Sequence, residues 1–109
     1  LAGDFVLKEV ARIVQSRIRR DEVFARYGGE EFAIILPETG LQGSVALAET
    51  LRQKIEEHIF TFQQDSIKVT ISLGATVLVE TDRVANDLIK RADEMLYEAK
   101  RTGRNRVCH

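Results

Sequence analysis

The sequence is poor in several residue types, and each shortage excludes a class of protein. Its single cysteine, Cys108, allows no internal disulfide, so we expect a domain that works in a reducing, cytoplasmic setting. No apolar run approaches the ~20 residues that cross a bilayer, and the first residues do not have the pattern of a signal peptide. The formal net charge of -1 leaves no basic excess. We therefore expect neither nucleic acid nor membrane as a partner of this domain.

Metal-binding side chains of the zinc type are also scarce. His58 lies at the end of a helical pattern, whereas Cys108 and His109 lie at the end of the sequence, so their spacing does not predict a metal site. The composition, with 44% hydrophobic and 30% charged residues, is ordinary for a globular protein. A chain of 109 residues is long enough for one core, and we expect a single domain over residues 1–109.

The hydrophobic pattern predicts both helices and strands. Helical spacing of apolar residues covers residues 4–20, 42–58 and 84–102. Strand patterns cover residues 23–27, 31–36 and 67–73, with a strand pair around 60–66 and a short last strand at 105–108. This order predicts an α/β sandwich in which helices flank a mostly antiparallel central sheet. Apolar residues at element spacing, among them Phe60, Phe62 and the region 95–97, are expected in the core.

The hairpin between residues 23 and 36 holds the sequence Gly28-Gly29-Glu30-Glu31. Two glycines predict a two-residue turn, and they leave a surface that another molecule can approach closely. Neighbouring strand side chains point to opposite faces, so both glutamates can serve one site only if Glu30 lies on the turn itself. Carboxylates there suit Mg²⁺ or a base for nucleotidyl transfer. For an arbitrary G-G-E-E, however, a solvated tip is the commoner explanation.

The stretch "RYGGEEF" resembles the signature of the GGDEF family, the diguanylate cyclases, in its glutamate variant. Three further stretches resemble the family in the same order and spacing: "GDFVLKEVA", "VTISLGAT" and "LIKRADEMLYEAKRTGRNRV". The resemblance covers almost the whole sequence. It implies the nucleotidyl-cyclase-like fold of that family, of the ferredoxin-like or palm type.

The resemblance implies an activity in which two GTP molecules form cyclic di-GMP and release two pyrophosphates across a homodimer. Glu30 would then bind Mg²⁺, or Mn²⁺ in its place, and help to deprotonate the attacking 3′-hydroxyl. Glu31 would support the metal site. Gly28 and Gly29 would let the phosphates lie against the turn.

Three further residues match substrate-binding positions of the family. Asp4 matches the aspartate that hydrogen-bonds the guanine edge, although a helix N-cap or a first-turn acid explains it equally well. Lys100 and Arg104 match the pair that grips the triphosphate, and the helix dipole alone also favours cations there. Ser72 and Gly74 match the family's strand pattern, and we assign them a structural role.

The sequence departs from the family at its start. The family's first strand and helix, with the pattern D-x-D-x-F-K-x-x-N-D, are missing, so we expect a partial domain that lacks one metal-binding aspartate. A missing central strand should expose apolar surface or invite pairing. The alternative function is therefore an impaired module that binds GTP or cyclic di-GMP as a sensor. A third interpretation is an unrelated α/β domain with a charged hairpin.

The inhibitory site of the family also differs. Many members bind cyclic di-GMP through R-x-x-D before the hairpin, and here Arg19 is followed by Glu22 in place of the aspartate. Thr50 stands where some members supply a second arginine. We expect no working inhibitory site of the usual kind, although product can occupy the active site. The family further implies an upstream sensory or receiver domain in a longer protein, which can be membrane-anchored.

Overall fold

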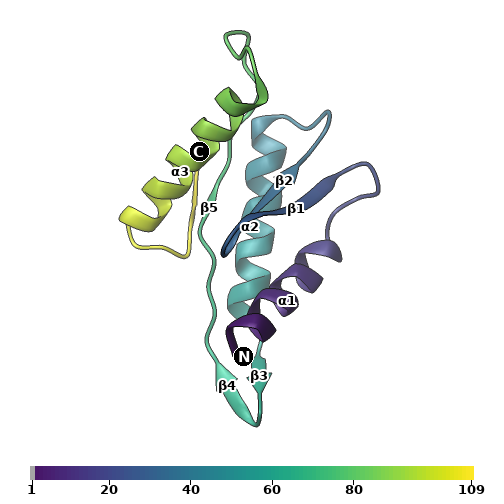
Figure 1. Ribbon diagram of the computed structural model, residues 1–109, viewed down its shortest axis with the longest axis vertical. Helices are drawn as coiled ribbons and strands as arrows, with labels where there is room; N and C mark the ends of the chain where they lie inside the picture. The colour runs from purple at the N-terminus through teal and green to yellow at the C-terminus, as the bar shows by residue number, and fades with distance from the viewer. Residues whose placement is uncertain (1) are drawn as a thin grey trace.

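The computed structural model describes residues 2–109, which form three helices and six strands (Figure 1). Along the chain these are α1 (Ala2–Gln15), β1 (Val23–Gly28), β2 (Glu31–Ile35), α2 (Leu41–Glu57), β3 (Phe60–Phe62), β4 (Asp65–Ile67), β5 (Leu73–Gly74), α3 (Ala85–Arg101) and β6 (Val107–Cys108). The molecule is elongated, with extents of 50 × 32 × 23 Å. None of the helices within residues 2–109 is long and apolar enough to cross a membrane.

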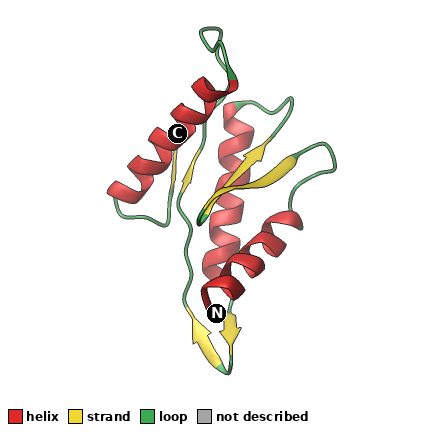
Figure 2. Cartoon of the chain, viewed as in Figure 1, coloured by secondary structure: helices red, strands yellow, loops and turns green. Residues whose placement is uncertain are grey.

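The strands form three two-stranded pairs (Figure 2). The pairs β1–β2 and β3–β4 are antiparallel, whereas β5–β6 is parallel. Helix α1 lies near the β3–β4 hairpin, and helix α3 lies beside β5 on the other side of the molecule (Figure 1). The mainly antiparallel α/β class is confirmed, but the sheet expected to be continuous is divided into separate pairs within residues 2–109.

The core lies where α1, α2 and β3 meet. Its buried members are Val10, Ile13, Val14, Leu51, Ile55 and Phe60. Phe24 and Ile34 of the first hairpin pack against this cluster, so the core also anchors the strands that carry the Gly-Gly-Glu-Glu turn. The expectation that Phe60 is buried is confirmed, since its side chain is fully covered.

The second and third helices agree with the predicted ranges to within one residue at each end, whereas α1 ends five residues earlier than predicted. Ser16 explains the early end, because its hydroxyl donates a 2.6 Å hydrogen bond to the carbonyl oxygen of Ile13. Such side-chain bonds compete with the next helical turn. At the end of α3, Gly103 takes the left-handed region at φ 132°, as expected for a helix stop.

The predicted strand at 67–73 is only partly correct. Regular strand is limited to β4 and β5, and residues 68–72 run between them as an extended segment (Figure 2). The predicted alternation is present, because Ile67, Val69 and Ile71 all pack against the core. Residues 68–72, however, have no strand partner within the described chain. A strand needs a hydrogen-bonded neighbour as well as an apolar face.

Candidate functional site

The hairpin turn lies one residue later than predicted. The β1–β2 register pairs Ala25 with Ala33 and then shifts, so that Gly28 lies opposite Glu31. Tyr27 is the extra residue that causes the shift. The turn is therefore Gly29-Glu30, and the prediction that Gly28 belongs to it is wrong. The condition that Glu30 must lie on the turn is met.

Arg26 holds this turn closed. Its guanidinium Nε donates a 2.9 Å hydrogen bond to the carbonyl oxygen of Gly29, and its Nη2 donates to the same oxygen. Gly29 has φ +24°, at the margin of the left-handed region where glycine is favoured. The contact spans only three residues and is exposed. The turn thus keeps its shape through local interactions.

The surface of the turn is open. A β-carbon added to Gly28 or Gly29 would meet no atom within 4 Å. Glu30 is exposed at the tip, and Glu31 is the first residue of β2. A ligand can therefore reach the backbone of the turn, and both glutamates are accessible to solvent beside it.

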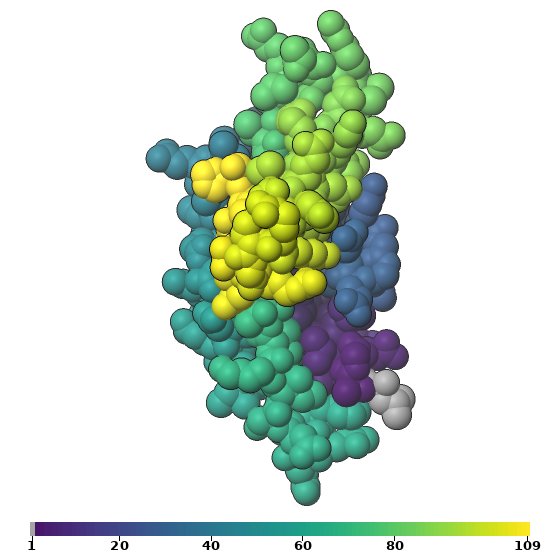
Figure 3. Space-filling model, turned by 90° about the vertical axis from the view of Figure 1, so that its left-hand side faces the viewer, coloured from purple at the N-terminus to yellow at the C-terminus, as the bar shows by residue number. Residues whose placement is uncertain are grey.

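Lys100, in the last turn of α3, reaches the hairpin. Its Nζ lies 3.6 Å from Oε2 of Glu31, and the two side chains are 40% and 43% exposed. An ion pair so exposed adds little stability. Its effect is to place a cation beside the carboxylates, and the end of α3 borders the hairpin on the molecular surface (Figure 3).

A small hollow of about 170 Å³ adjoins this pair. It is lined by Glu31, Asp93, Leu96, Tyr97 and Lys100. Tyr97 is 66% exposed, so its expected place in the core is wrong. The sequence offered a signal for this, because Asp93, Tyr97 and Lys100 follow the spacing of a single helix face.

Asp4 lies apart from the turn in the contacts that the structure records. It is exposed in the first turn of α1, as the third helical residue, so it is a first-turn acid and not the N-cap. Within residues 2–109, no hydrogen bond or ion pair joins Asp4 to the hairpin. The structure therefore brings together Glu30, Glu31 and Lys100, but it does not add Asp4 to them.

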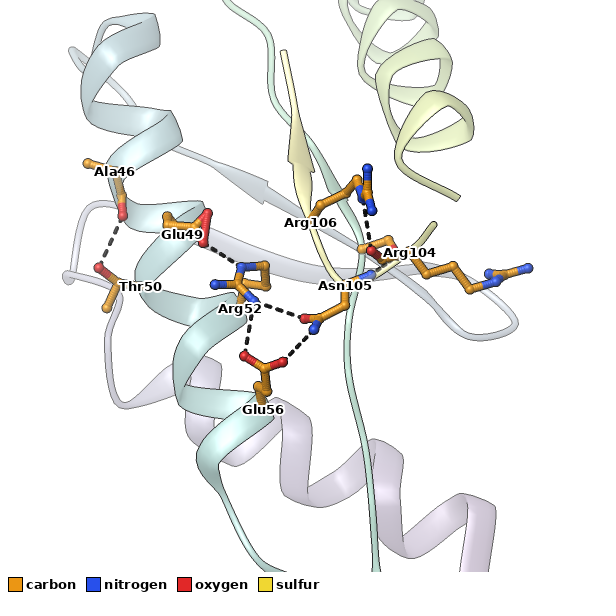
Figure 4. Close-up of polar contacts among 9 residues, drawn as sticks. Ala46, Glu49, Thr50, Arg52, Glu56, Arg104, Asn105 and Arg106 are labelled. Carbon is orange, nitrogen blue, oxygen red and sulfur yellow. Dashed lines mark hydrogen bonds and ion pairs between the residues drawn. The ribbon is translucent and has the colours of Figure 1, made fainter. Parts of the chain in front are cut away.

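Arg104 follows α3 in a loop of residues 103–106. Its amide donates a 2.8 Å hydrogen bond to the carbonyl oxygen of Ala99, and its side chain extends away from α2 (Figure 4). Ser72 and Gly74 support the neighbouring backbone. Ser72 Oγ accepts a 3.2 Å bond from the amide of Asn105, and Gly74 packs directly on the backbone of α3. Both residues therefore make structural contacts.

Arg19 and Glu22 face one another within one turn. The Glu22 carboxylate accepts a 2.6 Å hydrogen bond from the amide of Arg19 and a 3.4 Å bond from its Nε. The Glu22 side chain is only 5% exposed. Thr50, for its part, donates a 3.0 Å bond to the carbonyl oxygen of Ala46 in its own helix.

The two carboxylates of the turn suit a magnesium ion whose other ligands come from the substrate. Within residues 2–109, no three or more metal-binding side chains are grouped in a way that could hold a metal ion. Mg²⁺ is commonly bound through one or two carboxylates together with phosphates and waters. Two adjacent glutamates on an open turn meet that description.

Comparisons with known proteins agree with this geometry. The family model "Diguanylate cyclase, GGDEF domain" matches residues 1–106. The chain is 43% identical over 106 residues to Diguanylate cyclase A of Treponema denticola, covering 97% of this chain and 29% of that protein. It is 39% identical over 107 residues to the response regulator PleD of Caulobacter vibrioides, covering 96% and 24%. The chain thus spans less than a third of these curated relatives.

Solved structures show the same fold. The active GGEEF domain of a diguanylate cyclase from Vibrio cholerae matches with a TM-score of 0.82 and 42% identity, covering 97% of this chain and 67% of that one. The GGDEF domain of DgcB from Caulobacter crescentus, solved in complex with c-di-GMP, matches with a TM-score of 0.86 and 29% identity. That match covers 97% of this chain and 63% of the DgcB chain.

Proposed function

Because this chain belongs to the GGDEF family of diguanylate cyclase domains, we propose that it condenses two GTP molecules into cyclic di-GMP and two pyrophosphates. The observation that carries the proposal is the open turn. Gly28 and Gly29 leave its backbone uncovered, while Glu30 and Glu31 lie beside that opening. An open backbone with adjacent carboxylates suits a nucleotide that arrives with its metal.

In this proposal the turn holds the phosphates and the ion that accompanies them. Glu30 and Glu31 supply carboxylate oxygens for Mg²⁺, or for Mn²⁺ in its place. When bound, such an ion neutralises the charge that develops on the phosphates. The glycines allow the phosphates to approach the backbone, and Arg26 keeps that backbone in shape through the Gly29 carbonyl oxygen.

The reaction joins two nucleotides by two equivalent steps. The 3′-oxygen of one GTP forms a bond to the α-phosphorus of the other, while the bond from that phosphorus to the pyrophosphate oxygen breaks. The hydroxyl proton passes to the Glu30 carboxylate, which acts as the general base. Each domain has one such turn, so two copies are needed to hold both nucleotides. We therefore propose a homodimer as the active form.

Three residues away from the turn complete the proposed substrate site. Lys100 and Arg104 bind the triphosphate, and the place of Lys100 beside Glu31 supports this role. Asp4 accepts hydrogen bonds from the guanine edge. Its exposure in the first turn of α1 leaves the carboxylate available.

Regulation of the usual kind is not part of the proposal. The Glu22 carboxylate is already bonded to the amide and Nε of Arg19, which disfavours a cyclic di-GMP site on that pair. Control by a sensory or receiver domain in a longer protein is supported by the relative described as a response regulator. We also propose a cytoplasmic localisation, because the domain would consume GTP and its cysteine, Cys108, is a free thiol.

The test is product formation from GTP and Mg²⁺, measured by chromatography. Glu30→Ala should reduce the rate by about 100-fold or more, as loss of a general base does. Glu57→Ala is the matched control, because Glu57 is an exposed glutamate with no ion pair among the described residues. Equal rates for the two variants would contradict the proposal. If the unmodified chain binds GTP but forms no product, the alternative function, a binding module, is favoured.

A further inference from the structure

The loop that carries Arg104 has an unusual backbone. Gly103, Arg104 and Asn105 have φ values of 132°, 63° and 47°, so three successive residues lie in the left-handed region. Two of them are not glycine, and such conformations persist only where the surroundings hold them. The loop must therefore be fixed by contacts outside itself.

Those contacts come from α2. The Asn105 side-chain oxygen accepts a 3.0 Å hydrogen bond from Nη1 of Arg52, while its Nδ2 donates to Glu56 Oε2. Arg52 Nη1 also donates to Glu56 Oε1 at 3.2 Å, which closes a three-membered network (Figure 4). A fourth residue, Glu49, accepts from Arg52 Nε. Both ends of the Asn105 amide are thus paired with α2.

The network is covered on the side of Arg52. The Arg52 side chain is 14% exposed, since it lies between α2 and the loop. The hydrogen bonds from Asn105 and Arg52 hold the pKa of Glu56 below its usual value. Arg52 is therefore the covered member of the network, whereas Glu56, whose side chain is 41% exposed, remains open to solvent screening.

Backbone contacts secure the rest of the loop. The amide of Asn105 donates to Ser72 Oγ, and the amide of Leu73 donates to the carbonyl oxygen of Arg106 at 3.0 Å. With the backbone fixed on this side, the Arg104 side chain leaves the loop in the opposite direction (Figure 4). The backbone from which the Arg104 side chain begins is therefore fixed before any ligand arrives.

We propose that Arg52, Glu56 and Asn105 are positioning residues that hold the Arg104 loop ready for the triphosphate of GTP. The inference rests on the proposed function of this site. Without the network, GTP binding would also have to order the loop. The free energy of binding would then be less favourable by the free energy of that ordering. A network that only stabilises the fold would lower the melting temperature without a selective loss of triphosphate binding.

The first variant is Asn105→Gly, because glycine keeps the left-handed backbone while the side chain is removed. Loss of these hydrogen bonds should raise KM for GTP about five- to tenfold and leave kcat within about twofold. The Kd for GTP and for GMP is measured by calorimetry alongside. GTP binding should weaken by the same factor, whereas GMP binding should stay unchanged because GMP lacks the β- and γ-phosphates.

A single variant and a double variant test whether the network can be rebuilt with exchanged partners. Asn105→Asp still accepts from Arg52 but places a carboxylate against Glu56, so KM should rise. Adding Glu56→Gln exchanges donor and acceptor, since the glutamine amide can donate to the new carboxylate. The net charge of the network is then unchanged from the original. The double variant should return KM to within about twofold of the original value, as expected for residues that act as one network.

The matched control is Arg91→Gln in the N-terminal half of α3. Arg91 bonds to Asp82 and to the carbonyl oxygen of Val77, so its loss should reduce stability without changing KM. The inference is overturned if Asn105→Gly behaves like Arg91→Gln, if GMP binding falls as much as GTP binding, or if the double variant is not rescued. If the unmodified chain neither binds GTP nor forms product, the proposed function fails and this inference fails with it.

Discussion

The hairpin turn and the C-terminal loop are both proposed to meet the phosphates of GTP, yet they are held in opposite ways. The turn depends on one exposed contact, Arg26 to Gly29, which spans three residues. The loop at 103–106 is tied through Asn105 to residues that lie 33 to 53 positions away in the sequence. One site is local and open, whereas the other is assembled by the fold.

The difference predicts how each segment responds to substitution. Side chains on the turn contribute little to the core, so their loss should lower the rate of product formation more than the free energy of unfolding. Residues that hold the loop join α2, β5 and α3, so their loss should affect both.

Gly74→Ala should cause the largest loss of stability. A β-carbon there would lie 2.3 Å from the amide nitrogen of Leu96 and 2.4 Å from the carbonyl oxygen of Ala92. Backbone atoms cannot move away cheaply, so the free energy of unfolding should fall by about 3 kcal/mol. Urea denaturation measures it. Gly28→Ala is the control from the turn, where the loss should stay within about 0.5 kcal/mol. A larger loss at Gly28 would refute the contrast.

Arg26→Ala should have an intermediate effect that stays local. It removes the hydrogen bonds to the Gly29 carbonyl oxygen, with an expected cost of about 1 kcal/mol or less. Amide exchange should accelerate at the turn and not at residues 103–106. Arg17→Ala is the control, because the Arg17 side chain has no hydrogen bond or ion pair among the described residues. Faster exchange in both segments would show that they are coupled.

Acid should weaken the loop's network, whereas the contact that holds the turn, from Arg26 to the Gly29 carbonyl oxygen, contains no carboxylate. The hydrogen bonds from Asn105 and Arg52 lower the pKa of Glu56 below its ordinary value of 4.5 in the folded state. A lowered folded-state pKa contributes stability that is present above pH 4.5 and is lost as the pH falls through the lowered value.

The measurement is the urea midpoint between about pH 7 and pH 3, where native carboxylates become protonated. Glu56→Gln should make the decline shallower, while Arg26→Ala should leave its slope as in the unmodified chain. Part of the decline should remain in Glu56→Gln, because the pKa values of Glu9, Asp82 and Glu98 are lowered by their arginine partners. An unchanged slope in Glu56→Gln would show that the network carries no charge-dependent stability.

Lys100→Ala should have the smallest effect on stability. Its ion pair with Glu31 is exposed on both sides, so the free energy of unfolding should change by less than about 0.5 kcal/mol. KM for GTP should nevertheless rise, because the proposed phosphate contact is lost. Thermal melting and steady-state kinetics separate the two effects. A clear loss of stability with an unchanged KM would assign Lys100 a structural role.

Much of this protein could be predicted from the sequence, because much of it depends on local interactions. The helices α2 and α3 agree with their apolar periodicity nearly to the residue. The hairpin follows from glycine preferences and from alternation along a strand, although its turn lies one residue later than predicted. The faces of residues 67, 69 and 71 are also correct, since a period of two is a property of the extended chain.

Other features were decided by the tertiary structure alone. The register shift at Tyr27 depends on how β1 and β2 align. Residues 68–72 remain outside regular strands because no described strand pairs with them. Periodicity records which side of an element is apolar, but it does not record which distant element lies opposite. For that reason the sequence alone determined the helices and the hairpin, whereas only the fold could place Glu30 on the turn and bring Arg52 and Glu56 to Asn105.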